Sequence, residues 1–172
     1  AIHFYPDDDY LKRPAEDIFW NIWGLYGFAE PPLEDSGPNS QGSAAKIRVF
    51  NPTVELDGWS SHYTTIYVDQ RDMPFLVDSL RMALNRWGLN IYTLQSNPVW
   101  ALRNDLGTIE GIHSDYVENA DREALMIIEV DLLSEREIEE LQRELTLVLD
   151  DVSTVVDSFD PMRMRLELLI AE

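Results

Sequence analysis

Three aspartates close together in the sequence are the side chains best placed to do chemistry. Asp69, Asp72 and Asp78 stand around one turn-like segment, and paired carboxylates can act as general acid and general base. Asp72 comes just before Pro74, however, and an aspartate in that position is typical of a helix N-cap. We favour the N-cap interpretation. A small hydrolase that uses these carboxylates is the alternative.

Other residue types used in catalysis are few. The sequence contains no cysteine, which excludes thiolate nucleophiles and cysteine-ligated metals. Its three histidines, His3, His62 and His113, are far apart, and none has the spacing of a metal-binding pair. No Gly-x-Gly-x-x-Gly segment follows a predicted strand, so the dinucleotide fingerprint is missing. We therefore expect no catalytic residue, no cofactor and no metal site in this chain.

The charge of the chain excludes whole classes of partner. Its 172 residues include 13 Lys and Arg against 32 Asp and Glu, a formal net charge of -19. Such a surface repels phosphate backbones and anionic lipids, so we expect neither a nucleic acid nor a membrane as partner. Hydrophobic residues make up 45% of the chain, which is enough for a buried core. Without a membrane-length apolar run or any disulfide, we expect a cytoplasmic protein.

The elements that must position these side chains begin with a helix. Apolar residues recur at helical spacing from Tyr10 to Phe28, and Pro14 suits its first turn. Residues 29–45 contain Pro-Pro, Gly-Pro and Gly-Ser pairs and almost no apolar side chains, which indicates a linker. We expect this linker to separate the helix from the main domain.

The main domain mixes strands and helices. Its patterns predict strands at 46–50, 64–68, 89–103, 108–113 and 125–130, a helix at 72–87, and a helix after a Ser134–Glu137 capping box. Asn97-Pro98 predicts a bulge or bend. The order from 64 onward is a split β-α-β unit, typical of the α+β ferredoxin-like fold. The usual fourth strand is not evident after the second helix, and Lys46–Phe50 could take its place.

The C-terminal helical pattern leaves two questions open. Its apolar stripe could form one long helix or two joined near Asp150-Asp151, and Pro161 predicts the start of a last helix. The part of the stripe from Val152 to Phe159 could pack on the N-terminal helix or on another chain. Trp59, which follows a turn-like Asp57-Gly58, is a further candidate for an interface.

The turn around Asp72 and the strand after it contain a recognisable pattern. Its residues are Asp72, Pro74, Leu76, Gly88, Asn90 and Ile91. They resemble the signature of ACT domains, in which a loop Asp-Arg-Pro-Gly-Leu follows the first strand and Gly-x-Asn-Ile begins the second. That family's glycine lets backbone amides approach an amino-acid carboxylate. Phe75 stands at this position here, and its side chain would crowd such a ligand.

Longer strings point to a narrower family. They are Arg48–Pro52, Asp57–Trp59, Asp72–Ser79 and Met82–Asn85. Together they resemble the N-terminal region of the large NAD-dependent glutamate dehydrogenases. The resemblance implies a non-catalytic regulatory or assembly domain. The catalytic domain would lie far downstream, and the parent enzyme would use NAD to convert L-glutamate oxidatively to 2-oxoglutarate and ammonia.

The resemblance also implies an organisation for the chain. We expect a β-α-β-β-α sandwich with extra helices at both ends, divided into a helical segment (1–28), a linker (29–45), an ACT-like domain (46–160) and the start of a helix leading to the next domain (161–172). The expected effector or interface loop consists of Arg71, Asp72, Met73, Pro74, Phe75 and Leu76. Expected partners are other domains of the parent enzyme, further subunits of a homo-oligomer and an amino-acid effector. A stand-alone amino-acid sensor of ACT type is the alternative.

Overall fold

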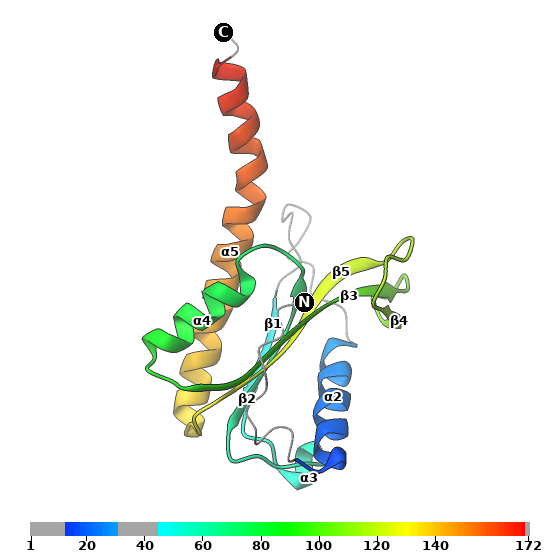
Figure 1. Cartoon of the computed structure of the whole chain (residues 1–172), viewed down its shortest axis with the longest axis vertical. Helices are drawn as coiled ribbons and strands as arrows, with labels where there is room; N and C mark the ends of the chain where they lie inside the picture. The colour runs from blue at the N-terminus through cyan, green and yellow to red at the C-terminus, as the bar shows by residue number, and fades with distance from the viewer. Residues whose placement is uncertain (1–12, 31–44, 171–172) are drawn as a thin grey trace.

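A computed structural model describes residues 13–30 and 45–170 and contains a mixed α/β fold with one sheet (Figure 1). Its elements, in chain order, are α2 (Ala15–Ala29), β1 (Lys46–Phe50), α3 (Val54–Asp57), β2 (Thr64–Arg71), α4 (Leu76–Arg86), β3 (Ile91–Arg103), β4 (Ile109–His113), β5 (Asp121–Val130) and α5 (Glu135–Ile170). The predicted strands and helices are therefore present. Strands β2 and β5 are longer than the predicted 64–68 and 125–130, and α4 is shorter than the predicted 72–87. Residues 10–12 of the predicted first helix lie outside the described residues.

The sheet has five strands in the order β1-β2-β5-β3-β4, all paired antiparallel. Because β2 and β3 both pair with β5, they run parallel to each other, and α4 connects them as a split β-α-β unit. The register places Lys46 opposite Asp69 and Phe50 opposite Thr65, so β1 occupies the free edge beside β2. This is the place of the fourth ferredoxin-like strand, which confirms the expectation for Lys46–Phe50.

The main core lies between one face of the sheet and the helices α4 and α5. Successive side chains of a strand point to opposite faces, so every second residue of β2 and β5 faces these helices. Leu141, Leu145 and Leu149 of α5 are completely buried there, as are Leu80 and Leu84 of α4. They pack against a strand layer that includes Ile66, Val68, Met126 and Ile128. A sheet covered by helices on one side is the two-layer arrangement expected for this fold.

The other face of the sheet is covered by α2, which forms a third layer (Figure 1). Leu25 and Ala29 of α2 are buried against Tyr67, Leu125 and Ile127. The helix lies on the N-terminal side of the expected linker, whose residues 31–44 fall outside the described part of the chain, and it packs directly on the sheet. The physical reason is that this second face is apolar and needs a cover. Trp59, expected at an interface, is also buried in this second core with 1% of its surface exposed.

The C-terminal pattern forms one continuous helix of 36 residues, so the expectation of a new helix at Pro161 was wrong. Proline removes one backbone donor from a helix interior, and α5 nevertheless runs through it and projects beyond the sheet (Figure 1). Val155 and Phe159 are 59% and 60% exposed. They do not pack on α2, which lies on the opposite face of the sheet. Within the described residues, no helix combines the length and apolar character needed to span a membrane.

Strand β3 passes through Asn97-Pro98 without the predicted bulge. Asn97 and Pro98 stay in register with Leu125 and Ala124 of β5, and the irregularities lie near the two ends of the strand. Strand β4 pairs with β3 only from Trp100 onward. The sheet edge is therefore open beside Pro98, where a residue without an N–H group can be accommodated.

Side-chain hydrogen bonds tie the ends of these elements together. Asn51 Nδ2 donates to the Leu133 carbonyl at 2.9 Å, Thr64 Oγ1 donates to Asn51 Oδ1 at 2.7 Å, and the Leu133 N–H donates to Thr64 Oγ1 at 2.8 Å. This ring joins the end of β1, the start of β2 and the turn before α5. The Glu137 half of the predicted capping box is present, because the Ser134 N–H and hydroxyl both donate to Glu137 Oε2. These bonds lower the pKa of the Glu137 carboxyl.

Candidate functional site

The expected effector or interface loop, Arg71 to Leu76, connects β2 to α4 and begins with two ion pairs. Asp72 does not cap the helix as predicted. Its carboxylate accepts from Arg122 Nε of β5 at 2.8 Å, and its N–H donates to the Arg122 carbonyl at 2.8 Å. Arg71 pairs with Asp157 of α5. Both cations nearest the loop are thus already bound to carboxylates, so an anionic ligand would have to share or displace these pairs.

The N-cap residue of α4 is Phe75, in a left-handed backbone conformation with φ of 72°. L-residues with a side chain avoid this region because the Cβ atom crowds the backbone, at a cost of about 1–2 kcal/mol. The ACT signature has glycine at this position, and glycine adopts a positive φ readily. Phe75 thus adopts the left-handed backbone conformation that glycine would adopt without strain. Strained residues of this kind are frequent at ligand and switch sites.

Two hollows meet at Phe75, whose side chain is 65% exposed. One, of about 250 Å³, lies between the loop and the strands and is lined by Asp72, Ser96, Pro98 and Arg122 among others. The second, of about 440 Å³, runs between α4 and α5 and is lined by Phe75, Asp78, Met82, Val148, Val152 and Val155 among others. Of the other loop residues, Met73 is half-buried, Pro74 is exposed, and Leu76 is anchored in the core. The loop residues Asp72 to Leu76 therefore line the smaller hollow, Phe75 lines both, and Arg71 lines neither.

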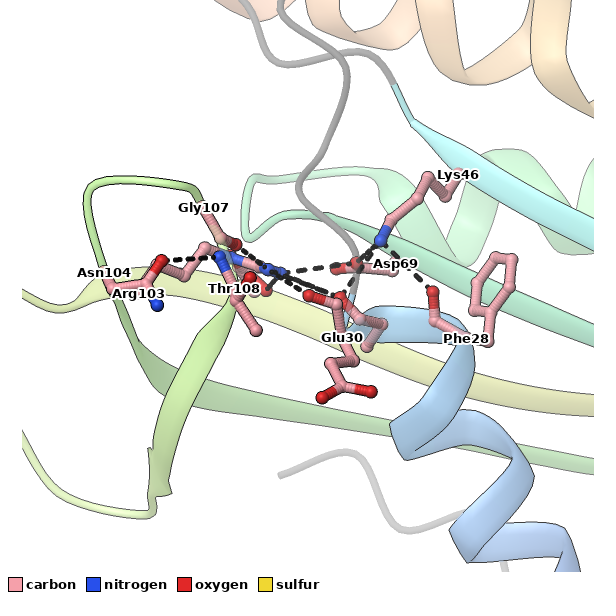
Figure 2. A network of polar contacts seen from close by, with 10 residues as sticks. Phe28, Glu30, Lys46, Asp69, Arg103, Asn104, Gly107 and Thr108 are labelled. Atoms are coloured by element: carbon pink, nitrogen blue, oxygen red, sulfur yellow. Dashed lines mark hydrogen bonds and ion pairs between the residues drawn. The ribbon is translucent and has the colours of Figure 1, made fainter.

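A buried ionic cluster, which we did not predict, lies on the opposite face of the sheet (Figure 2). It consists of Lys46 on β1, Asp69 on β2, Arg103 on β3 and Glu123 on β5. The Asp69 carboxylate is fully buried and lies 3.1 Å from Lys46 Nζ and 3.6 Å from an Arg103 nitrogen. Arg103 also holds Glu123 in a bidentate pair at 2.7 and 2.8 Å. Alternation with buried Tyr67 was the signal that could have placed Asp69 on this face.

The same two cations bind the C-terminal end of α2. Lys46 Nζ donates to the carbonyls of Phe28 and Ala29 at 3.2 and 3.0 Å. Arg103 donates to the carbonyls of Ala29 and Glu30. Helix C-termini leave carbonyls without partners and carry partial negative charge, so cations are stabilising there. The buried ionic cluster therefore fastens α2 to the sheet.

Burial and the charge of Glu123 raise the pKa of Asp69 to about 6, against the opposing effect of Lys46 and Arg103. Such a carboxyl could exchange protons near neutral pH, which is the property of a catalytic acid or base. However, Asp69 has no exposed surface on which a substrate could lie. The cluster therefore acts in packing. No group of three or more His, Cys, Asp or Glu suited to a metal ion occurs among the residues that the structure describes.

The split β-α-β sheet, the edge strand β1 and the Asp72–Leu76 turn before α4 define the class of an ACT-like, ferredoxin-like domain. The sequence comparison agrees and is narrower: residues 2–145 match the family described as glutamate dehydrogenase, ACT1 domain. The chain belongs to this family.

Two curated relatives carry the name NAD-specific glutamate dehydrogenase. The protein from Halomonas elongata is 35% identical over 170 residues, which are 97% of this chain and 10% of the relative. The protein from Pseudomonas aeruginosa is 37% identical over 128 residues, which are 73% of this chain and 8% of the relative. The chain thus spans about a tenth of the length of these relatives. No solved structure matches it.

Proposed function

We propose that this chain acts as a non-catalytic regulatory and assembly domain within a large NAD-specific glutamate dehydrogenase. The parent reaction is the oxidation of L-glutamate by NAD to 2-oxoglutarate and ammonia. The observation that carries the proposal is the family match over residues 2–145, together with relatives of that name that are about ten times longer. On this proposal the NAD site and the catalytic residues lie elsewhere in the parent enzyme.

The ion pairs between elements in the described residues support this role. Buried carboxylates such as Asp69, Glu123 and Glu129 pair with cations of neighbouring elements. Half-buried Asp72 and exposed Arg122 pair across the loop. These groups hold elements in place, which is what an assembly domain requires.

The loop cavity supports a regulatory component. Asp72 and Arg122 place opposite charges on the wall of the hollow of about 250 Å³. A free amino acid carries both an ammonium and a carboxylate group, so these two side chains complement it in charge. The same observation supports the second candidate, a stand-alone amino-acid sensor of ACT type.

The first test is calorimetric titration of the chain with glutamate, aspartate and arginine, and with NAD as the control. We expect no NAD binding and no glutamate-dependent reduction of NAD by the chain alone. Turnover by the purified chain would refute the proposed non-catalytic role.

Variants then locate any amino-acid binding. Arg122→Ala should abolish it, because the carboxylate loses its cation, whereas Arg136→Ala on the exposed side of α5 should leave it unchanged. An equal loss of amino-acid binding in Arg122→Ala and Arg136→Ala would show that the ligand does not bind at the loop. If no amino acid binds at millimolar concentration, the assembly role stands alone and the sensor is excluded.

A further inference from the structure

The helix α2 leaves several large apolar side chains exposed, whereas an ordinary surface helix turns such residues toward the core. Phe19 and Trp23 are each 56% exposed, and Ile22 is 53% exposed. The residues that α2 buries are Asn21, Leu25 and Ala29. Exposure of large apolar residues is costly when they form a continuous surface, and such surfaces mark sites of interaction.

These side chains form one surface, the aromatic patch, defined by Phe19, Trp20, Ile22, Trp23 and Leu56. The rings of Phe19 and Trp23 stack with centroids 6.1 Å apart and an interplanar angle of 13°. Trp20 meets Phe19 edge-on at 5.4 Å. Leu56 of α3, 84% exposed, adjoins them across a hollow of about 320 Å³ whose lining includes Trp20, Trp23, Gly58 and Leu56.

The Trp20 ring of the patch packs closely against the backbone at Gly58. Gly58 has φ of 80°, and the position of an added Cβ atom there would lie 3.1 Å from the Trp20 ring. A side chain at residue 58 would therefore displace Trp20. Rings that are already ordered lose little conformational entropy on binding, so a rigid aromatic surface favours tight association.

The rim of the patch is acidic. Glu16, three residues before Phe19 on α2, and Glu55, next to Leu56 on α3, are both exposed. The cation Arg48 is paired with Asp57 at 2.9 Å. The whole chain carries a net charge of -19. Two copies meeting through this surface would bring like charges together, whereas a partner with an apolar centre and basic rim would be complementary.

We propose that the aromatic patch is the docking surface for another part of the same enzyme polypeptide, apolar at its centre and basic at its rim. The inference rests on the proposed function, because the chain spans only 10% and 8% of the two relatives and the rest of such a polypeptide supplies the occupant. The patch is distinct from the loop at Phe75, which lies on the side of the sheet that α4 and α5 cover.

The test introduces the photo-crosslinking amino acid p-benzoylphenylalanine at position 23 of the full-length enzyme, and at position 106 as the control. Leu106 is 81% exposed in the turn between β3 and β4, away from the patch. After irradiation, mass spectrometry identifies the joined peptides. We expect position 23 to join a peptide from outside these 172 residues that contains Lys or Arg beside apolar residues, with at least a tenfold higher yield than position 106.

Two outcomes would overturn the proposal. Joining of position 23 to these same 172 residues of another subunit would assign the patch to a second copy. A yield no higher than at position 106 would show that nothing docks there. Glutamate-dependent NAD reduction by the same preparation tests the proposed function separately. Lack of turnover in the full-length enzyme would count against that function, while the crosslinks still decide the occupant of the patch.

A paired variant gives a second readout. Phe19→Ser with Trp23→Ser should leave the fold and far-ultraviolet circular dichroism of the chain intact, because both side chains are more than half exposed. In the full-length enzyme the pair should speed hydrogen exchange in the docked peptide, and Leu106→Ser should not. Unchanged exchange with the paired variant would contradict the docking surface even if the crosslink formed.

Discussion

At the scale of single residues, Phe75 and Asp69 are the positions where local preference conflicts with the fold. Phe75 holds a left-handed backbone that glycine would adopt without strain. Asp69 keeps a carboxylate at a position with no exposed surface. Each conflict can be measured, because each has a nearly isosteric or matched replacement.

We expect Phe75→Gly to be more stable than Phe75→Ala by about 1 kcal/mol, because only glycine relieves the strain of the positive φ. Both variants lose the same ring, which is 65% exposed and contributes little burial. Urea unfolding of the two variants measures the difference. An alanine variant as stable as the glycine variant would show that the backbone at residue 75 is unstrained.

The pH dependence of stability tests Asp69. Its pKa is about 6 in the folded chain against 3.8 as the ordinary value, so the folded state binds this proton more tightly than the unfolded state. The stabilisation is complete below about pH 4 and is lost as the pH rises to about 6, by about 3 kcal/mol in total.

Asp69→Asn removes this titration. The wild type loses this stabilisation between pH 4 and pH 7, and the variant does not. The free energy of unfolding of the variant relative to the wild type should therefore increase by up to about 3 kcal/mol over this range. Denaturant unfolding at both pH values measures it, and Glu139→Gln, which alters an exposed carboxylate on α5, is the control. Parallel pH profiles of wild type and Asp69→Asn would contradict the assignment.

At the scale of elements, α2 is fastened to the sheet at both ends and in the middle. Arg13, just before the helix, pairs with buried Glu129 at 2.6 and 2.8 Å. In the middle, the Tyr67 hydroxyl donates to the carbonyl and the side-chain oxygen of Asn21, each at 2.8 Å. The buried ionic cluster holds the C-terminal end. A helix held in three places belongs to the domain, which explains why the family match includes it.

Two glycines of α2 give a matched test of this contact. An added Cβ atom at Gly24 would lie 3.0 Å from the Tyr67 hydroxyl oxygen, whereas at Gly27 nothing lies within 4 Å. Gly27→Ala should stabilise the chain by about 0.5–1 kcal/mol through helix propensity. Gly24→Ala should stabilise the chain less, or destabilise it, because the added methyl group would crowd the Tyr67 hydroxyl that donates to Asn21. Thermal unfolding measures both, and equal gains would show that α2 is not closely packed at residue 24.

Loss of the central hydrogen bond is a separate prediction. Tyr67→Phe removes a buried donor and leaves two acceptors on Asn21, which should lower the free energy of unfolding by about 1–3 kcal/mol. Tyr116→Phe is the control, since Tyr116 is 71% exposed and should change stability by less than about 0.5 kcal/mol. Chemical denaturation compares them. A Tyr67→Phe variant as stable as its control would mean that the hydroxyl does not fasten α2.

At the scale of the whole molecule, the net charge of -19 sets the electrostatic behaviour. Like charges on a compact surface repel one another, and salt screens them. Raising the ionic strength from about 0.01 M to about 0.15 M shortens the Debye length from about 30 Å to about 8 Å. We expect the thermal unfolding midpoint to rise over this range, equally in sodium and potassium chloride. A falling midpoint would mean that favourable ion pairs outweigh the repulsion.

The sequence by itself determined the elements and their class. Periodicity located β2, α4 and β5, because alternation and helical spacing are local consequences of burying one side of an element. The motif from Asp72 to Leu76 located the loop, and the absence of a strand after α5 pointed to Lys46–Phe50 at the sheet edge. The Ser134–Glu137 capping box could also be predicted, since both partners lie within one helical turn.

Only the tertiary structure decided which distant residues meet. Lys46, Asp69, Arg103 and Glu123 come from four strands, and no spacing in the sequence records that they converge under α2. The same holds for Asp72, whose partner Arg122 lies on β5 and replaces the predicted cap. Whether Trp59 was buried or exposed likewise depended on the position of α2. Local patterns report what one element needs to bury, whereas the identity of the covering element is a property of long-range packing.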